Sequence, residues 1–432
     1  MASQDRLYAE LYDYIVDFLH DDEDALRACA LVCRDWALAS RYHLFYQIRL
    51  TGSAPSPTRS WAQNTACRRI FATILSSPHL AAYVNRLTVQ ETNVVRPSTY
   101  RWVSGEIAFP SLLSKLTSLR ALEFNFPNPG PASDKTGWST MAFRDIIEAM
   151  TTMSLESLSM RQFSFSSLHD FIKLLDICRH LKTLQLDHVD ITTSTTLFSP
   201  SALEHVLNMQ LSDSMSQTSE TKANLETLLL RSNNLSLIIP VLLHPRSFLD
   251  LTSVRHLTIN VTPESYRIVV ELLGRLPNIE SLDIEIEHDF DYEAHLEPRD
   301  IIDASLMPCL KSLSIQSSIL LGRTDPIPWI SNTLSTASNR NILEDMSLTC
   351  IIDKPPPSLT VQAFDEALVG WHNLDDLLTQ PTFNTMKRVR LDFILDNPSG
   401  DDTLPSISQE FTKQLQKLSK KGVLEVDFCE AR

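Results

Sequence analysis

Glycine is scarce in this sequence, at 9 of 432 residues. Phosphate-binding loops need glycines at fixed spacing, and neither GxxxxGK(S/T) nor GxGxxG occurs. The GxSxG and HExxH patterns of hydrolases and metalloproteases are also lacking. Apolar runs are short, and none approaches the roughly 18 residues that cross a bilayer. These absences disfavour nucleotide-binding enzymes, hydrolases and membrane-spanning proteins.

The seven cysteines are scattered, odd in number, and form no CxxC pair. We therefore expect free and mostly buried thiols in a reducing compartment. The first residues, MASQDRLYAELYDY, contain early acids and no apolar core of a secretory signal. The sequence thus predicts a protein of the cytoplasm or nucleus, or both.

Basic residues are outnumbered, with 38 Lys and Arg against 53 Asp and Glu, and the formal net charge is −15. Such a chain repels phosphate backbones, so general nucleic-acid binding is disfavoured. Cys29 and Cys33 could together contribute to a metal site, but no nearby His or Cys pair completes it, and core packing is the favoured interpretation. We predict no catalytic residues, no metal and no cofactor, and hence a protein that is not an enzyme.

The N-terminal segment predicts two helices with apolar faces. LYAELYDYIVDFL places Leu7, Leu11, Ile15 and Phe18 or Leu19 at helical spacing. Asp24 is expected to cap a second helix that carries Leu26, Cys29, Ala30 and Cys33 on one face. A segment of about 45 residues cannot bury all these side chains within itself. The surplus packs either on the rest of the chain or on a protein partner, and the pattern alone leaves both open.

The same segment, LYAELYDYIVDFLHDDEDALRACALVCRDWALASRYHLFYQIRL, resembles an F-box of the type common in fungal proteins. The matching positions are Leu7, Glu10, Leu11, Ile15, Leu19, Leu26, Leu31, Val32, Arg34 and Trp36. One departure is Tyr8, which stands where the family usually has proline. The resemblance implies that residues 1–50 bind the Skp adaptor of a Skp–cullin–F-box ubiquitin ligase. It also implies the adaptor contacts, which are Leu7, Glu10, Leu11, Ile15, Leu26, Val32 and Trp36.

After a linker and connecting helix over residues 51–79, a phrase of the form LxxLxL recurs eleven times at spacings of 25 to 44 residues. Examples are LRALEF at 119, VRHLTI at 254 and IESLDI at 279, and helical patterns lie between the phrases. A repeated strand and helix is typical of leucine-rich repeats. We predict an α/β fold in which residues 80–432 form an irregular solenoid, with parallel strands on its concave face and helices on its convex face. The alternative is an ordinary βαβ fold with a parallel sheet.

One repeat matches the family phrase LxxLxLxxNxL closely, through Leu225, Leu228, Leu230, Asn233 and Leu235. Leu228, Leu257, Leu282 and Leu313 occupy one phrase position in four successive repeats and are predicted to be buried and equivalent. The residue that follows this position should project from the other face of the strand. That row comprises Glu123, Ser159, Gln185, Leu229, Thr258, Asp283, Ser314, Ser347 and Arg390.

The most acidic stretch of the chain, between 280 and 300, follows one of these strands. Asp283, Glu285 and Glu287 should face outward, two repeats after the apolar Leu229. An apolar contact beside negative charge suits a basic protein segment with an apolar anchor. These four residues are the predicted substrate-binding site, although a solvated acidic face would give the same pattern.

The sequence thus predicts a substrate-recognition adaptor, in which the F-box binds the Skp adaptor and the repeats bind a protein substrate. The alternative is a regulatory or scaffold solenoid whose F-box-like helices only cap the repeats.

Overall fold

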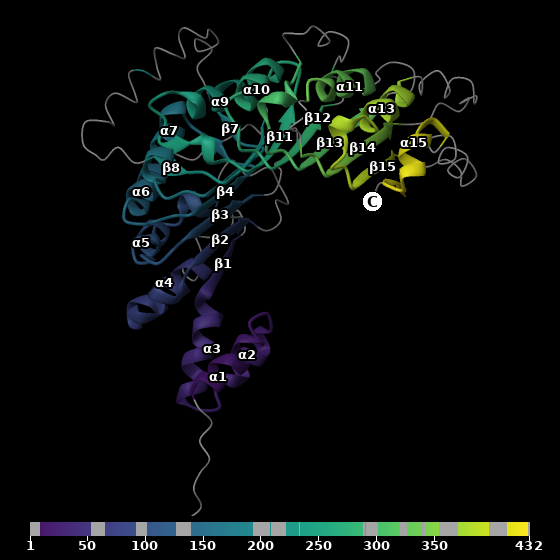
Figure 1. Ribbon diagram of the computed structural model, residues 1–432. Helices are drawn as coiled ribbons and strands as arrows, with labels where there is room; N and C mark the ends of the chain where they lie inside the picture. The colour runs from purple at the N-terminus through teal and green to yellow at the C-terminus, as the bar shows by residue number, and fades with distance from the viewer. Residues whose placement is uncertain are drawn as a thin grey trace, which may run out of the picture. The chain divides into compact units, whose positions relative to one another are not determined.

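The computed structural model describes residues 9–52, 65–91, 102–126, 140–192, 208, 222–232, 234–287, 290, 301–319, 326–337, 342–353, 370–396 and 413–430. The chain divides into two compact units, Met1–Ala223 and Asn224–Arg432. Both units contain parallel strands and helices, so the predicted α/β class is confirmed (Figure 1). Asn233 lies outside the described residues.

The first unit begins with three helices, α1 (Ala9–Asp17), α2 (Glu23–Cys29) and α3 (Arg34–Tyr46). The cap of α2 is Asp22 and not Asp24, because the Asp22 carboxylate accepts a 2.9 Å hydrogen bond from Ala25 N–H. The expectation for Cys33 was also wrong. Helix α2 ends at Cys29, and Cys33 is the exposed residue that precedes α3.

Five parallel strands follow in the first unit, in the order β1 (Gln47–Gly52), β2 (Arg86–Glu91), β3 (Ala121–Asn125), β4 (Ser157–Arg161) and β6 (Thr183–Asp187). Strand β1 starts inside the predicted F-box segment and ends inside the predicted linker. The sheet therefore begins one strand earlier than the phrases indicated.

Helices connect the strands of the first unit and cover one face of its sheet (Figure 1). They are α4 (Ala66–Ser76), α5 (Ala108–Leu113), α6 (Thr140–Met150) and α7 (Leu168–Ile177), with the 3-10 turns η1 (Pro78–Tyr83) and η2 (Trp102–Gly105). The short β5 (Ser164–Phe165) and β7 (Asp190–Ile191) pair in parallel, and β8 (Ala223–Asn224) lies at the boundary of the units.

Two contacts join β1 and the start of α4 to the segment at residues 102–106. Gly52 lies against the ring of Trp102, and a Cβ atom at this position would collide with the ring. Glu106 is buried and accepts hydrogen bonds from Thr65 Oγ1 at 2.6 Å and from Arg68 Nε at 2.9 Å. Burial alone would raise the pKa of Glu106, but these hydrogen bonds outweigh it and hold the pKa below its ordinary value.

The second unit contains seven parallel strands in chain order. They are β9 (Thr227–Arg231), β11 (His256–Val261), β12 (Ser281–Ile286), β13 (Ser312–Ile319), β14 (Asp345–Asp353), β15 (Arg388–Asp396) and β16 (Leu424–Glu430). The helices are α9 (Leu235–Leu243), α10 (Tyr266–Leu273), α11 (Ile327–Ser335), α13 (Trp371–Leu378) and α15 (Gln416–Lys421). Shorter elements are β10 (Leu249–Asp250), η4 (Leu251–Ser253), η7 (Ala304–Leu306) and η8 (Pro381–Phe383).

Strand register confirms the predicted equivalence of the four leucines. Leu228 pairs with Leu257, Leu257 with Leu282, and Leu282 with Leu313, and all four are buried. The residues that follow them also lie in register, as predicted, and side chains there are at least partly exposed. Consecutive strands are neighbours, and the described helices cover one face of the sheet (Figure 1). This order is compatible with a solenoid, because a doubly wound sheet reverses its strand order and has helices on both faces.

A line of charged residues runs across the start of the strands, at the second position of the nine phrases from 119 to 386. In the first unit it consists of Arg120, Glu156 and Lys182. In the second it consists of Glu226, Arg255, Glu280, Lys311, Glu344 and Lys387. The sign alternates from one strand to the next. Glu280 Oε1 lies 3.2 Å from Arg255 Nη1, and Glu280 Oε2 lies 2.6 Å from Lys311 Nζ. We call this row the charge ladder.

Candidate functional site

The inner side of helices α1–α3 forms a small core. Val16, Leu26, Cys29 and Ala37 are buried between the helices. Trp36 is partly buried, and its ring lies 5.8 Å from that of Tyr12 in α1. His43 Nε2 lies 2.8 Å from Asp17 Oδ1 and joins α3 to α1. These contacts use one face of each helix.

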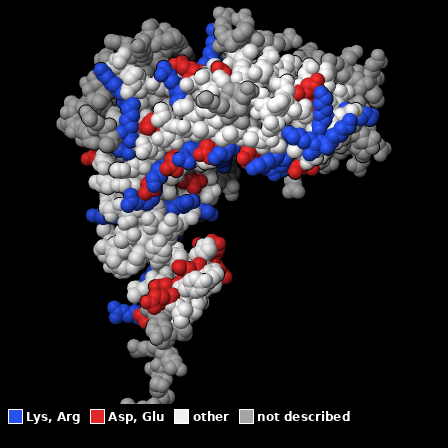
Figure 2. Space-filling model, in the orientation of Figure 1, with Lys and Arg blue, Asp and Glu red and all other residues white. Residues whose placement is uncertain are grey.

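The outer side of the same helices is unusually apolar. The large apolar side chains that α1 leaves exposed are Leu11, Tyr14 and Ile15, and Phe18, which follows the helix, is 71% exposed. Between α2 and α3, Leu31 is 88% exposed and Val32 is 65% exposed. The helices α1–α3 are purple in Figure 1. In Figure 2 the same region shows red acidic side chains beside white residues that are not charged. We call these six residues the apolar surface of α1–α3.

The predicted adaptor contacts divide into three groups. Glu10, Leu11, Ile15 and Val32 are exposed and available to a partner. Leu26 is only 1% exposed, so its assignment as a contact was wrong, because it faces α3 as part of the helical core. Trp36 is shared between the core and the surface, and Leu7 lies outside the described residues.

Three members of the apolar surface were not among the predicted contacts. Tyr14, Phe18 and Leu31 are the most exposed or among the most exposed large apolar residues of the helices. The helical spacing already included Phe18 or Leu19, and it could also have found Tyr14, which lies four residues before Phe18 with ring centroids 4.8 Å apart. Leu31 could not be placed from spacing, because α2 ends before it.

The predicted substrate site lies on the face of the second unit's sheet that the described helices leave uncovered; we call this the open face. Leu229 pairs with Thr258, and Thr258 pairs with Asp283, so the structure brings the apolar and acidic positions into one row. Asp283 and Glu285 are partly exposed, and Glu287 is exposed just beyond β12.

Sequence reasoning missed a cation in this site. Arg231 lies in β9, and its Nε is 3.0 Å from Glu285 Oε2. The arginine spans the strand between them and neutralises one of the three acids. The negative charge offered to a partner is therefore carried mainly by Asp283 and Glu287, and it is weaker than the sequence predicted.

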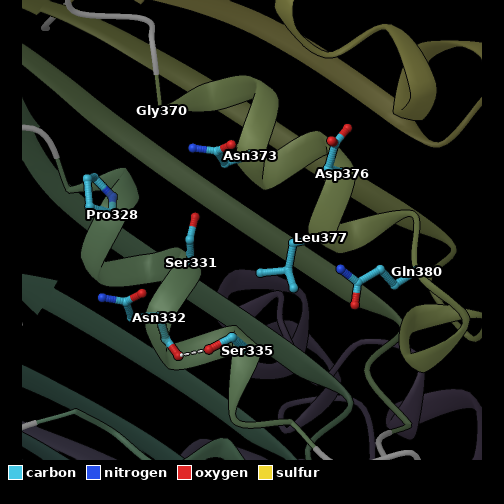
Figure 3. Close-up of a pocket in the computed structure, with 9 residues that line it drawn as sticks. All are labelled: Pro328, Ser331, Asn332, Ser335, Gly370, Asn373, Asp376, Leu377 and Gln380. Carbon is cyan, nitrogen blue, oxygen red and sulfur yellow. Dashed lines mark hydrogen bonds between the residues drawn. The ribbon is translucent and has the colours of Figure 1, made fainter. Parts of the chain in front are cut away.

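A polar hollow lies between α11 and α13 on the helical side of the second unit (Figure 3). It is lined by Pro328, Ser331, Asn332, Ser335, Gly370, Asn373, Asp376, Leu377 and Gln380. Ser335 donates to the carbonyl of Asn332 at 2.7 Å, and Asp376 lies 2.6 Å from Lys417 Nζ. The lining contains amides, hydroxyls and one engaged carboxylate, and it holds no nucleophile with an adjacent base.

Two buried cysteines have thiols whose pKa is raised. Burial raises the pKa of Cys178 to about 12, and burial followed by the nearby Glu106 charge does the same for Cys67. Both thiols are protonated at neutral pH and are poor nucleophiles. Within the described ranges, no three His, Cys, Asp or Glu side chains gather in a way that could hold a metal ion. The described helices are each too short or too polar to cross a membrane.

No protein-family model matches this sequence, and no curated protein matches it.

Proposed function

We propose that this chain is the substrate-recognition subunit of a Skp–cullin–F-box ubiquitin ligase. In this proposal α1–α3 are the F-box and bind the Skp adaptor, and the strands and helices that follow are degenerate leucine-rich repeats that bind a protein substrate. The chain carries out no chemistry itself, since the ligase partners bring the charged ubiquitin. The proposal rests on the F-box resemblance of residues 7–50 and on one observation, the apolar surface of α1–α3.

The apolar surface consists of six large apolar side chains that are exposed on or between these three short helices. Single exposed apolar residues are normal on proteins, whereas several on so small a unit support a binding surface. Leu11, Ile15, Leu31 and Val32 belong both to this surface and to the positions that match the F-box pattern. These four are among the ten positions that match the F-box pattern, and their side chains are exposed.

The alternative, in which these helices only cap the repeats, is less well supported. A cap protects the end of a solenoid by turning a polar outer face to solvent. Here the outer face carries Phe18, Leu31 and Val32 instead.

Leu31→Asp in the full-length chain is the sharpest test of adaptor binding. Its side chain makes little contact within the protein, so the substitution leaves the helical core intact. Truncating an interface hot spot costs about 2 kcal/mol or more, which is a roughly thirtyfold weaker Kd. Trp36→Ala is a poorer choice, because Trp36 also packs on Tyr12.

The matched control is Leu75→Asp. Leu75 is also exposed, but it lies in helix α4, outside the three helices proposed to bind the adaptor. Affinity for a purified Skp adaptor would be measured by calorimetry for the wild type and both variants. The proposal predicts adaptor binding that Leu31→Asp weakens by about thirtyfold or more and that Leu75→Asp preserves. No binding by the wild type, or equal loss in both variants, would overturn it.

For the substrate, we propose that a basic segment with an apolar anchor binds the open face at Leu229, Asp283, Glu285 and Glu287. The supporting observation is the shared register of Leu229 and Asp283. Arg231 provides a test in the opposite direction from charge reversal, because it neutralises Glu285. Arg231→Ala should strengthen the binding of a basic peptide.

The companion variant changes Asp283, Glu285 and Glu287 to Lys and should weaken the same peptide. Glu271→Lys is the control, since Glu271 is exposed on helix α10. A panel of basic and acidic peptides, each with one leucine, would be titrated at low and physiological salt. If all variants bind the panel alike, the acids are only solubilising surface.

A further inference from the structure

Strand β16 ends the sheet of the second unit and has one unpaired edge. It pairs in parallel with β15 from Val389↔Leu424 to Leu395↔Glu430, and no other strand among the described residues lies beside it. Its place is the yellow end of the chain in Figure 1. An unpaired edge offers a row of backbone N–H and C=O groups to another extended chain.

The direction of these groups follows from one hydrogen bond. Val389 N–H donates to the carbonyl of Val423 at 2.7 Å. Along a parallel strand, residues direct their N–H and C=O alternately to one neighbour and then the other. Val423 therefore directs its C=O, and Glu425 and Asp427 direct both backbone groups, toward β15. Leu424, Val426 and Phe428 direct theirs to the unpaired edge.

The apolar side of β16 is also left partly uncovered. Val389 and Leu391 in β15 are buried, whereas their partners Leu424 and Val426 in β16 are partly exposed. Elsewhere in the sheet, the residues at the same strand positions have a further strand beside them and are buried. An added strand would cover both the backbone edge and these side chains.

The other side of β16 is acidic. Glu425 and Asp427 are exposed, and Arg390 is shared between Asp392 at 2.9 Å and Asp427 at 3.3 Å. One cation thus stands against three acids at this edge. The charge disfavours a second copy of this chain, because pairing β16 with itself would bring like acids together.

We infer that the outer edge of β16 binds an extended peptide in which basic and apolar residues alternate. The peptide adds a strand through the backbone groups of Leu424 and Val426. Its apolar side chains cover Leu424 and Val426, and its basic side chains face Glu425 and Asp427. Strand addition of this kind takes affinity from the main chain and specificity from alternate side chains. The inference is independent of adaptor binding.

The probe is the capped, fluorescently labelled hexapeptide Lys-Val-Lys-Val-Lys-Val, measured by anisotropy against the full-length protein. A peptide with Glu in place of Lys tests charge, and one with Pro in place of Val tests the need for backbone donors. Of these three peptides, we expect only the Lys-Val peptide to bind. Hydrogen exchange should show new protection of the amides of Leu424 and Val426.

Two variants make the test specific. Val426→Pro removes an N–H that points away from β15, so the sheet keeps its internal bonds. We expect about tenfold weaker binding, as for the loss of one well-formed hydrogen bond. Charge reversal of Glu425 and Asp427 to Lys should transfer the preference to the Glu-Val peptide. Circular dichroism would check that both variants are folded.

Three results would overturn the inference. The first is no binding of the Lys-Val peptide by the wild type. The second is equal binding of the Lys-Val and Glu-Val peptides. The third is a wild type that self-associates through this edge, shown by light scattering as a dimer that Val426→Pro dissociates.

Discussion

Asp375 and Asp376 are adjacent in helix α13, and we expect their substitution to affect stability very differently. Asp375 is buried, and its two carboxylate oxygens accept hydrogen bonds from Lys417 N–H at 2.9 Å and Leu418 N–H at 2.8 Å. It thereby satisfies amides in the first turn of α15, which have no partner within that helix. Asp376 is exposed, and its carboxylate pairs with the side chain of Lys417 at 2.6 Å. Asp375 therefore joins α13 to α15 inside the protein, whereas Asp376 forms an ion pair at the surface.

The expected cost of Asp375→Ala follows from these bonds. Leaving a buried donor without its partner costs about 1–3 kcal/mol, and removing a helix cap costs about 0.5–2 kcal/mol. The two figures describe the same amides, so we expect a total of about 2–3 kcal/mol. Asp375→Asn keeps one acceptor oxygen and should lose about half as much. Asp376→Ala should have no measurable effect, as is usual for exposed ion pairs.

Native-state hydrogen exchange is the suitable assay, because a chain of this size need not unfold in one step. The amides of Lys417 and Leu418 report local opening of α15 directly. Asp375→Ala should accelerate their exchange, while Asp376→Ala should leave it unchanged. Equal acceleration in both variants would refute the assignment of Asp375 as a buried cap.

Three further predictions test other parts of the fold. Leu282→Ala should cost about 2–5 kcal/mol in urea unfolding, as for other buried leucines, whereas the exposed Leu306→Ala should cost little. Because the pKa of Glu106 is lowered, its carboxylate stabilises the protein above the ordinary glutamate pKa, and this stability is lost as the pH falls toward the lowered value. Glu106→Gln should therefore be less stable at neutral pH and show a smaller fall in melting temperature on acidification. Glu280→Lys places three cations in a row of the charge ladder, and its lower melting temperature should recover at high salt; a salt-independent deficit would contradict this.

The strands could be predicted from the sequence because their pattern is local. Alternating apolar residues specify which side chains are buried, and every one of the eleven phrases lies at a described strand. Strand β1 was missed although Ile48 and Leu50 alternate in the same way, since both residues fall inside the segment that resembles an F-box. The parallel order of the strands was a hypothesis that local pattern could not establish, because it depends on contacts between residues far apart in the chain.

The site was less predictable, for reasons that differ from residue to residue. Leu26 matches the F-box pattern as well as Val32 does, yet one is buried and the other exposed. Pattern alone cannot divide apolar residues between a core and a partner. Arg231 was invisible for another reason, because its contact with Glu285 joins strands that are not adjacent.

The charge ladder shows what an alignment of the phrases does contain. The second residues of the first six phrases in the second unit read Glu, Arg, Glu, Lys, Glu and Lys, so carboxylates and cations alternate along these strands. The hydrogen bond from Lys311, more than any other contact, holds the pKa of Glu280 below its ordinary value. Each pair is exposed and contributes little to stability by itself. The alternation matters more for which strands become neighbours. A pairing that skipped one strand would bring two like charges together, whereas one that skipped two would bring opposite charges together. The buried strand positions carry similar aliphatic side chains in most repeats, so these side chains cannot specify which strand lies beside which. We expect the ladder to supply that discrimination at the surface, where a sequence can vary without disturbing the core.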